Sequence, residues 1–464
     1  MTKLTKSILA IDIGTTSVVS IVAKNDYNDK INILGIGKSV SNGIAKGAII
    51  DIDLASTSIK NSVDIARSSS GNNIDETIVS ISGIHTKSRR SVGSINIPSG
   101  HITIKEINQV LAIALYDAQI VPEYEAIHVI PLYFKVDNND EIDNPLNMNG
   151  SRLEVYAHII TAKKTSLTNI KSALKSSNIE VTNFVLSAYA STIATIKEDQ
   201  MKSGTAVLDL GGSTSELAIF KNKSMLYNDI IPIGSEHITH DLSIMLHTPL
   251  NAAGEVKKQY ASLIPKREDQ DLNTITKVKI PVLGNESESK EISLDFIQPI
   301  IHARVEEILC LIKDKITING LTPSVNNIVL TGGMSKVPGL DILAKKVFPN
   351  IPVKISNPIN IQNGYIDFND ATLSTIVGLL FYGLDSDPTF ELDSNKQLRT
   401  KKEKVYTPEV KIQEKITQTV STRINTRQTE ELNDLANDLN SIKIDKKEKK
   451  SLLASFWKKI GDLL

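Results

Sequence analysis

Apolar and polar positions follow one another in short runs that predict strands, tight turns and amphipathic helices. The first run, ILAIDIGTTSVVSIV at 8–22, is an apolar stretch, a polar turn and a second apolar stretch. Further strands are predicted at 30–37 and 77–82, with a helix over 53–69 between them. This succession of strands and helices predicts an α/β domain.

The opening pattern returns in the middle of the chain as TAVLDLGGSTSELAIF at 205–220. The two copies align through Asp12 and Asp209, which lie about 200 residues apart, so we predict a duplicated pair of domains. A total of 464 residues also exceeds the roughly 250 to 300 at which a single core stops growing. The aligned turns contain Gly14, Thr15 and Thr16 in the first copy and Gly211, Gly212, Ser213 and Thr214 in the second.

These turns have the chemistry of a polyphosphate site, because glycines, backbone amides and hydroxyls form a concave anion cradle. Asp12 and Asp209 would then lie beside phosphates, which is tolerable if a hydrated Mg²⁺ stands between the charges. A third turn, TGG with Gly332 and Gly333, follows the apolar strand that begins at 327 and precedes an amphipathic segment that we predict to be a helix. One such turn alone is usually an ordinary β-turn, but three in this order predict a nucleotide site.

Between 84 and 162 the pattern changes to strand, helix, strand and strand, which we interpret as a small α+β insert. The pattern by itself leaves open whether this insert binds other proteins or is only a lid or spacer. A long helix over 292–317 has Ile297, Ile301 and Val305 on its core face. The single cysteine, Cys310, falls in this helix and is expected to be buried.

The C-terminal part differs in composition from the rest of the chain. From 385 to 450 it is rich in Asp, Glu, Lys, Thr and Asn with few apolar residues, which predicts a flexible tether. Residues 451–464 regain a helical pattern whose apolar positions fall within an arc of about 140°, preceded by four lysines in 446–450. This predicts a helix that lies in an anionic membrane interface, although it could instead dock on the protein itself or on another protein. The residues of this predicted membrane contact are Leu452, Leu453, Phe456, Trp457, Lys458, Lys459, Ile460, Leu463 and Leu464.

The overall charge and composition are those of an ordinary globular protein. A formal net charge of −1 with 41% apolar residues gives no reason to expect nucleic acid as a partner. No signal-peptide pattern precedes the first strand, and no apolar run reaches the roughly 18 residues of a spanning helix. We therefore expect the protein on the cytoplasmic side of the membrane.

Two DxG turns, a TGG turn, the insert and the basic terminal helix together resemble the bacterial cell-division FtsA family, within the actin, heat-shock-chaperone and sugar-kinase ATPase superfamily. The resemblance implies an actin-like fold of two α/β lobes with ATP and Mg²⁺ between them. It also implies that Glu255 and Lys258, at i and i+3, approach the ribose and adenine, although they could be only a solvated ion pair. Ser187 stands where chaperone ATPases have a glutamate, so hydrolysis is expected to be slow, and no catalytic residue is assigned.

FtsA resemblance further implies a protein that polymerises on the inner membrane face at the division septum. Its partners would be other copies of itself, the C-terminal peptide of FtsZ on the second lobe, and later division proteins. The alternatives are an enzyme of the same fold, either a chaperone-like ATPase or a small-molecule kinase, and a relative that assembles type IV pili. The expected divisions are a first lobe at 1–83 and 163–200, the insert at 84–162, a second lobe at 201–384 with its own insert at about 248–310, the linker at 385–450 and the terminal helix at 451–464.

Overall fold

The computed structural model describes residues 6–26, 30–68, 70, 74–139, 141–264, 277–361, 367–384 and 390–400. The predicted terminal helix, and the predicted tether from residue 401 onward, lie outside these ranges. Within them, no helix has both the length and the apolar character needed to cross a membrane.

The first lobe is built on a five-stranded sheet in the order β10-β6-β1-β2-β3. β1, β2 and β3 form an antiparallel meander, whereas β6 and β10 run parallel to β1. Every residue from Ile8 to Ile11 in β1 is buried, as expected of a central strand covered on both faces. The elements are β1 (Ser7–Ile13), β2 (Ser17–Asn25), β3 (Ile31–Val40), β4 (Ile44–Ala45), β5 (Ala48–Ile49), α1 (Ile52–Ser68), β6 (Glu76–Ile81), α3 (Lys164–Lys175) and β10 (Asn183–Leu186).

The second lobe repeats this topology with the order β13-β12-β11-β16-β17. Again three strands form a meander and two further strands run parallel to the first of them. The duplication predicted from the two DxG patterns is therefore confirmed. The elements are α5 (Glu198–Ser203), β11 (Thr205–Leu210), β12 (Ser215–Lys221), β13 (Ser224–Ile231), α6 (Ser235–Met245), α7 (Leu250–Tyr260), β14 (Lys277–Val282), β15 (Asn285–Ser293), α8 (Leu294–Ile318), β16 (Asn327–Thr331), α9 (Leu340–Val347) and β17 (Val353–Ile355).

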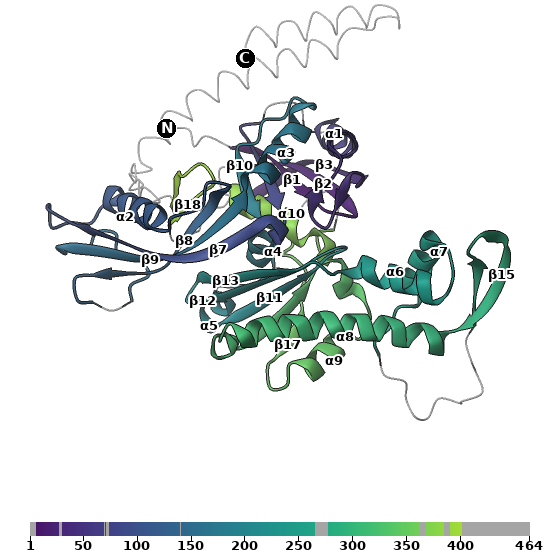
Figure 1. The fold of residues 1–464 in the computed structure, drawn as a ribbon. Helices are drawn as coiled ribbons and strands as arrows, with labels where there is room; N and C mark the ends of the chain where they lie inside the picture. Colours follow the sequence, from purple (N-terminus) through teal and green to yellow (C-terminus); the bar gives the residue numbers. More distant parts are fainter. Residues whose placement is uncertain are drawn as a thin grey trace, which may run out of the picture. The chain divides into compact units, whose positions relative to one another are not determined.

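Two helices cross between the lobes (Figure 1). α4 (Ser187–Thr195) packs on the sheet of the second lobe, and α10 (Ser374–Leu384) packs on the sheet of the first. They approach closely because Gly378 has no side chain, since a Cβ there would lie 1.8 Å from the carbonyl oxygen of Ala190. Their crossing sets how the two sheets face each other.

The insert has its own hydrophobic core and the predicted strand, helix, strand, strand order. α2 starts with a capping box in which Thr103 and Glu106 satisfy each other's backbone amides. The insert also touches the second lobe, where His158 Nε2 lies 2.9 Å from Asn228 Oδ1. Its elements are β7 (Thr86–Asn96), α2 (Ile104–Asp117), β8 (Tyr124–Val136) and β9 (Arg152–Lys163).

The prediction of a flexible linker from residue 385 onward is wrong for residues 390–400, which are folded. β18 (Glu391–Leu392) pairs with β8, and β19 (Leu398–Arg399) pairs with β18, so both extend the sheet of the insert. Phe390 and Leu392 are buried there. Residues 390–400 are mostly polar, but their polar side chains form hydrogen bonds with residues far away in the sequence, such as the bond between Asn183 and Asp393.

The expected core face of α8 is confirmed, because Ile297, Ile301 and Val305 are each 0% exposed. Cys310 was expected to be buried and is exposed. It lies on the outer face of the amphipathic helix, beside the fully buried Leu309.

Candidate functional site

Asp12 and Asp209 lie at matching ends of the two central strands. Ser80, at the equivalent end of the parallel neighbour β6, donates from Oγ to Asp12 Oδ1 at 2.8 Å. Burial, together with the negative charge of Asp209, raises the pKa of Asp12 to about 6 against the lowering effect of this hydrogen bond. The negative charge of Asp209 therefore disfavours the charged form of Asp12, as like charges in one site do.

Asp209 is held by both inter-lobe helices. Burial raises its pKa, while hydrogen bonds from Ser191 of α4 and Thr375 of α10 lower it. Thr375 Oγ1 donates to Asp209 Oδ2 at 3.3 Å. A carboxylate on the central strand of one lobe is therefore oriented by the crossing that joins the lobes.

The second glycine turn is fastened to the start of α6. The carbonyl oxygens of Gly211 and Gly212 accept hydrogen bonds from the amides of Ser235 and Glu236 at 3.0 and 2.8 Å. Ser213 Oγ donates to Glu236 Oε2 at 2.5 Å. These contacts fix the turn, and they add Glu236 to the site, which the sequence patterns had not indicated.

The first and second turns meet where the two lobes adjoin. A Cβ on Gly212 would lie 2.7 Å from Thr16 Cγ2, so the two turns are in contact through a position that only glycine fits. Within the second turn, the amide of Gly211 donates to the carbonyl oxygen of Thr214 at 2.9 Å. Gly14 closes the first turn tightly, because its Cβ would meet the carbonyl oxygen of Ser17 at 2.8 Å.

The third turn is also part of this arrangement. β16 runs parallel to β11, with Thr331 beside Asp209, so the next residue, Gly332, is brought against that carboxylate. Gly332 has φ of 85°, and a Cβ there would lie 2.4 Å from Asp209 Oδ1. The predicted order of strand, double glycine and helix is confirmed: Gly333 opens a 3₁₀ turn, η3 (Gly333–Lys336), and α9 begins after Gly339.

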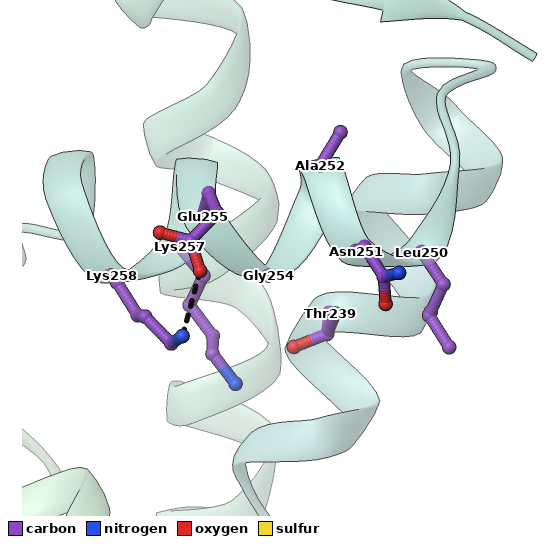
Figure 2. Close-up of a pocket in the computed structure, with 8 residues that line it drawn as sticks. All are labelled: Thr239, Leu250, Asn251, Ala252, Gly254, Glu255, Lys257 and Lys258. Atoms are coloured by element: carbon purple, nitrogen blue, oxygen red, sulfur yellow. Dashed lines mark hydrogen bonds and ion pairs between the residues drawn. The ribbon is translucent and has the colours of Figure 1, made fainter. Parts of the chain in front are cut away.

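Glu255 and Lys258 line a cavity of about 500 Å³ between α6 and α7. Lys258 Nζ lies 2.7 Å from Glu255 Oε1, and both side chains are largely exposed. Figure 2 shows this pair, with Lys257 and Lys258 extending toward the side where Thr239 of α6 lies. Lys257, which the sequence analysis missed, donates to the carbonyl oxygen of Ser235 at 2.8 Å and so links the cavity to the helix that holds the second turn.

Glu216 is a buried carboxylate that sequence reasoning also missed. It stands opposite Asp209 in the β11–β12 pair, and its Oε1 accepts hydrogen bonds from Ser82 Oγ at 2.8 Å and the Gly83 amide at 3.1 Å, both in the first lobe. Burial, together with the charge of Asp209, raises the pKa of Glu216 to about 7. The strand register puts its side chain on the same face of the sheet as that of Asp209, and only the fold shows that it reaches the other lobe.

Four carboxylates, those of Asp12, Asp209, Glu216 and Glu236, therefore lie near three glycine turns at the meeting of two lobes. Two of them, Asp12 and Asp209, are half-buried, and the charge of Asp209 raises the pKa of Asp12, a charge arrangement that fits a hydrated divalent cation. Backbone amides and hydroxyls of the turns supply donors for oxyanions. The arrangement fits a nucleotide whose phosphates and cation lie between the lobes.

Comparison with known families gives two matches. Residues 206–378 match the family described as "Cell division protein FtsA", and residues 83–161 match "SHS2 domain inserted in FTSA". The chain is 33% identical to the cell division protein FtsA of Helicobacter pylori strain ATCC 700392 / 26695, with 86% of each chain covered. It is also 33% identical to FtsA of Borreliella burgdorferi, covering 81% of this chain and 90% of the relative.

Solved structures show the same fold at low identity. A type IV pilus biogenesis complex, PilM-PilN, aligns with a TM-score of 0.57 at 14% identity over 82% of this chain and 98% of that chain. MreB5 of Spiroplasma citri bound to ADP aligns with a TM-score of 0.51 at 12% identity over 81% and 96%. These similarities establish an actin-like fold, and at such identities they indicate the fold alone.

Proposed function

We propose a function from one established fact, that this chain belongs to the FtsA family of cell division proteins. The protein would bind ATP and polymerise on the inner face of the cytoplasmic membrane at the division septum. There it would anchor FtsZ filaments and recruit later division proteins. The 33% identity over 86% of the chain favours this function over a chaperone-like ATPase, a small-molecule kinase or a pilus-assembly protein.

ATP would lie between the lobes, with its phosphates against the three glycine turns. The observation that carries this proposal is the burial of Asp12 beside Asp209, two carboxylates that repel each other until a cation neutralises them. Mg²⁺ would supply that positive charge and bind both through water. The cavity beside Glu255 and Lys258 would receive the adenosine, together with Gly332 and Gly333.

ATP would act mainly as a ligand that selects one arrangement of the lobes. Ser187 begins α4 at the place where the chaperone ATPases have a glutamate, so turnover is expected to be slow. Glu216 lies nearby but already accepts two hydrogen bonds from the first lobe. It would therefore hold the lobes together rather than activate water.

Membrane attachment would depend on the terminal segment 451–464. Each basic residue near an anionic surface contributes about 1 kcal/mol, and each large apolar side chain somewhat less than the roughly 1.5 to 3 kcal/mol of full burial. One such helix would bind reversibly. A polymer would present many helices at a high effective concentration, so assembly and attachment would reinforce each other.

The FtsZ peptide would bind at the end of the second lobe where α6, the β14–β15 hairpin and the start of α8 meet. Large apolar side chains are exposed here, among them Ile244 at 68% and Phe296 at 49%. Leu283 is close by, because its amide donates to the carbonyl oxygen of His247 just after α6. Later division proteins would contact the insert.

The membrane proposal is tested by sedimentation with vesicles of phosphatidylcholine and phosphatidylglycerol, using the full chain and a chain that lacks 451–464. We expect the full chain to sediment with the vesicles and the shortened chain to stay in solution. Ser455→Ala, outside the apolar arc, is the matched control and should bind as the full chain does. Equal sedimentation of full and shortened chains would overturn membrane attachment through this segment.

The FtsZ contact is tested by fluorescence anisotropy with a labelled FtsZ C-terminal peptide. Ile244→Ser and Phe296→Ser should each weaken binding severalfold. Ile318→Ser is the control, because Ile318 is 82% exposed at the other end of α8. If all three variants bind the peptide equally, this end of the second lobe is not the docking surface.

A further inference from the structure

A second cavity lies in the first lobe, beside the base of the insert. Its volume is about 210 Å³, which is below the roughly 300 to 1,000 Å³ of pockets that hold drug-sized ligands. The β4–β5 hairpin, the ends of β1 and β6, the 3₁₀ turn η1 (Gly83–His85) and the start of α3 surround it. A molecule that fits this cavity is therefore small.

Several polar side chains converge on this cavity without partners of their own. Within the described part of the chain, five of its lining side chains have no hydrogen-bond or ion-pair partner. No aspartate or glutamate is among the described residues that line it. All five can donate hydrogen bonds, so they form a set of donors without an acceptor. They are His85, Lys163, Thr165, Ser166 and Asn169.

Two of these five side chains are basic. Burial, together with the positive charge of Lys163, lowers the pKa of His85. The two basic groups thus act on each other at one cavity that has no carboxylate in its described lining, and like charges disfavour each other's charged forms. An anion in the cavity would offset this repulsion.

The start of α3 adds to the positive potential of the cavity. The first turn of α3 has no acidic residue, and no side chain caps it. Lys163 and Lys164 stand at this end instead, where positive charge opposes the helix dipole. An anion bound beside them would balance both the lysines and the dipole.

The inner wall of the cavity adjoins the proposed nucleotide site. Ser80 and Ser82 belong to this wall, and their hydroxyls are already used. Ser80 Oγ donates to Asp12 Oδ1 at 2.8 Å. Ser82 Oγ donates to Glu216 Oε1 at 2.8 Å. The cavity therefore lies next to the carboxylates of the nucleotide site and is separated from them by two serines.

The cavity is closed on one side and accessible on another. Gly47 brings the β4–β5 hairpin against the serine wall, because a Cβ there would lie 2.5 Å from Ser82 Oγ. Lys163 and Thr165 are exposed to solvent, so a small anion can reach the cavity from outside.

We propose that this cavity is a binding site for inorganic phosphate. Phosphate is a small tetrahedral anion, and its oxygens accept hydrogen bonds from ammonium, hydroxyl and amide groups such as those of Lys163, Thr165 and Asn169. Its place beside a nucleotide rests on the proposed function, whereas phosphate binding itself is measured without nucleotide. The terminal phosphate of bound ATP has the same chemistry, and the experiment separates these two sources.

The test is isothermal titration calorimetry of the full chain with phosphate, in a chloride buffer without nucleotide. We expect saturable binding of one phosphate per chain, with sulfate as a competitor because it has the same shape. Lys163→Gln should weaken phosphate binding about tenfold, because it removes a charged donor. Thr165→Val, which removes one hydroxyl and keeps the shape, should weaken it severalfold.

Lys164→Gln and Thr168→Val are the matched controls, because both residues are exposed on α3 and neither lines the cavity. Both should bind phosphate as the wild type does. Equal weakening by Lys164→Gln and Lys163→Gln would mean a general attraction to this end of the helix and would overturn the site. Absence of saturable binding in the wild type would overturn it as well.

Thermal unfolding shows whether the variants are folded. Without phosphate, all four variants should unfold near the wild-type Tm. Added phosphate should raise the Tm of the wild type and of both controls, since a molecule that binds only the folded state stabilises it. The same rise in Lys163→Gln would contradict the proposal.

A further titration with ATP and with ADP, each with Mg²⁺, separates the two sources of phosphate. Lys163→Gln should keep the wild-type affinity for both nucleotides. Loss of affinity for ATP but not for ADP would assign Lys163 to the terminal phosphate of the nucleotide and overturn a separate phosphate site. If the wild type binds phosphate but no ATP, the proposed function fails while the phosphate site stands, so the two failures are distinguishable.

Discussion

Replacing Asp12 by asparagine should stabilise the ligand-free protein and weaken its binding of ATP with Mg²⁺. Asparagine has the same shape and can still accept the hydrogen bond from Ser80 Oγ that Asp12 accepts at 2.8 Å. It removes the charge that repels Asp209. The two effects therefore have opposite signs, which separates a ligand-binding carboxylate from a merely structural one.

The magnitude follows from the pKa of Asp12, which burial raises from 3.8 to about 6. At about 1.4 kcal/mol for each pH unit, the charged carboxylate lowers the free energy of unfolding by up to about 3 kcal/mol. The penalty is absent below pH 3.8, where Asp12 is protonated in both folded and unfolded chains. It grows up to about pH 6 and is complete above it. Partial exposure of Asp12 makes this an upper value.

The assay is urea denaturation of wild type and Asp12→Asn in EDTA, at about pH 4 and about pH 7.5. The variant should match the wild type at the lower pH and exceed it by up to about 3 kcal/mol at the higher pH. Equilibrium dialysis with ATP and Mg²⁺ should show at least a tenfold loss of affinity, about 1.4 kcal/mol. Asp64→Asn, exposed on α1, is the control and should change neither quantity.

Two results would refute this reasoning. A variant that is less stable than the wild type at both pH values would mean that Asp12 has a structural role and no repulsive burial. Unchanged ATP affinity would mean that neither the cation nor the phosphates depend on the Asp12 charge.

Three further substitutions test the geometry of the cleft. Gly332→Ala should lower ATP affinity at least tenfold, about 1.4 kcal/mol, because the new Cβ meets Asp209 Oδ1. Gly100→Ala is the control and should have little effect in the same dialysis assay, because Gly100 also has a positive φ but lies in the insert with no atom within 4 Å of the new Cβ. Gly378→Ala should lower the free energy of unfolding by about 1 to 3 kcal/mol in urea because it separates α4 from α10; stability equal to wild type would disprove the tight crossing. Glu216→Ala should lower the free energy of unfolding in urea by about 1 to 3 kcal/mol, because it leaves the Ser82 hydroxyl and the Gly83 amide without an acceptor. Glu216→Gln keeps an acceptor oxygen, so its free energy of unfolding should stay near that of the wild type.

The sequence by itself determined the local elements and the repeated chemistry. Apolar runs around Asp12 and Asp209 predicted two central strands, since a strand buried on both faces must be apolar along its length. The glycines of the turns predicted anion sites, because positive φ and close approach require a residue without a side chain. Alignment of the two copies was enough to predict two similar domains, whereas a nucleotide site between them was implied by the family resemblance.

Tertiary structure alone decided which distant groups meet. Glu216 and Lys257 look like ordinary polar residues of a strand and a helix until the fold brings them to Ser82 and to Ser235. Glu391 lies in a polar stretch that composition assigned to a linker, yet it is buried because Tyr189, Tyr382 and His128 come from three other elements. Local patterns record the surroundings of a strand or turn, whereas hydrogen bonds between residues hundreds of positions apart leave no periodic signal in the sequence.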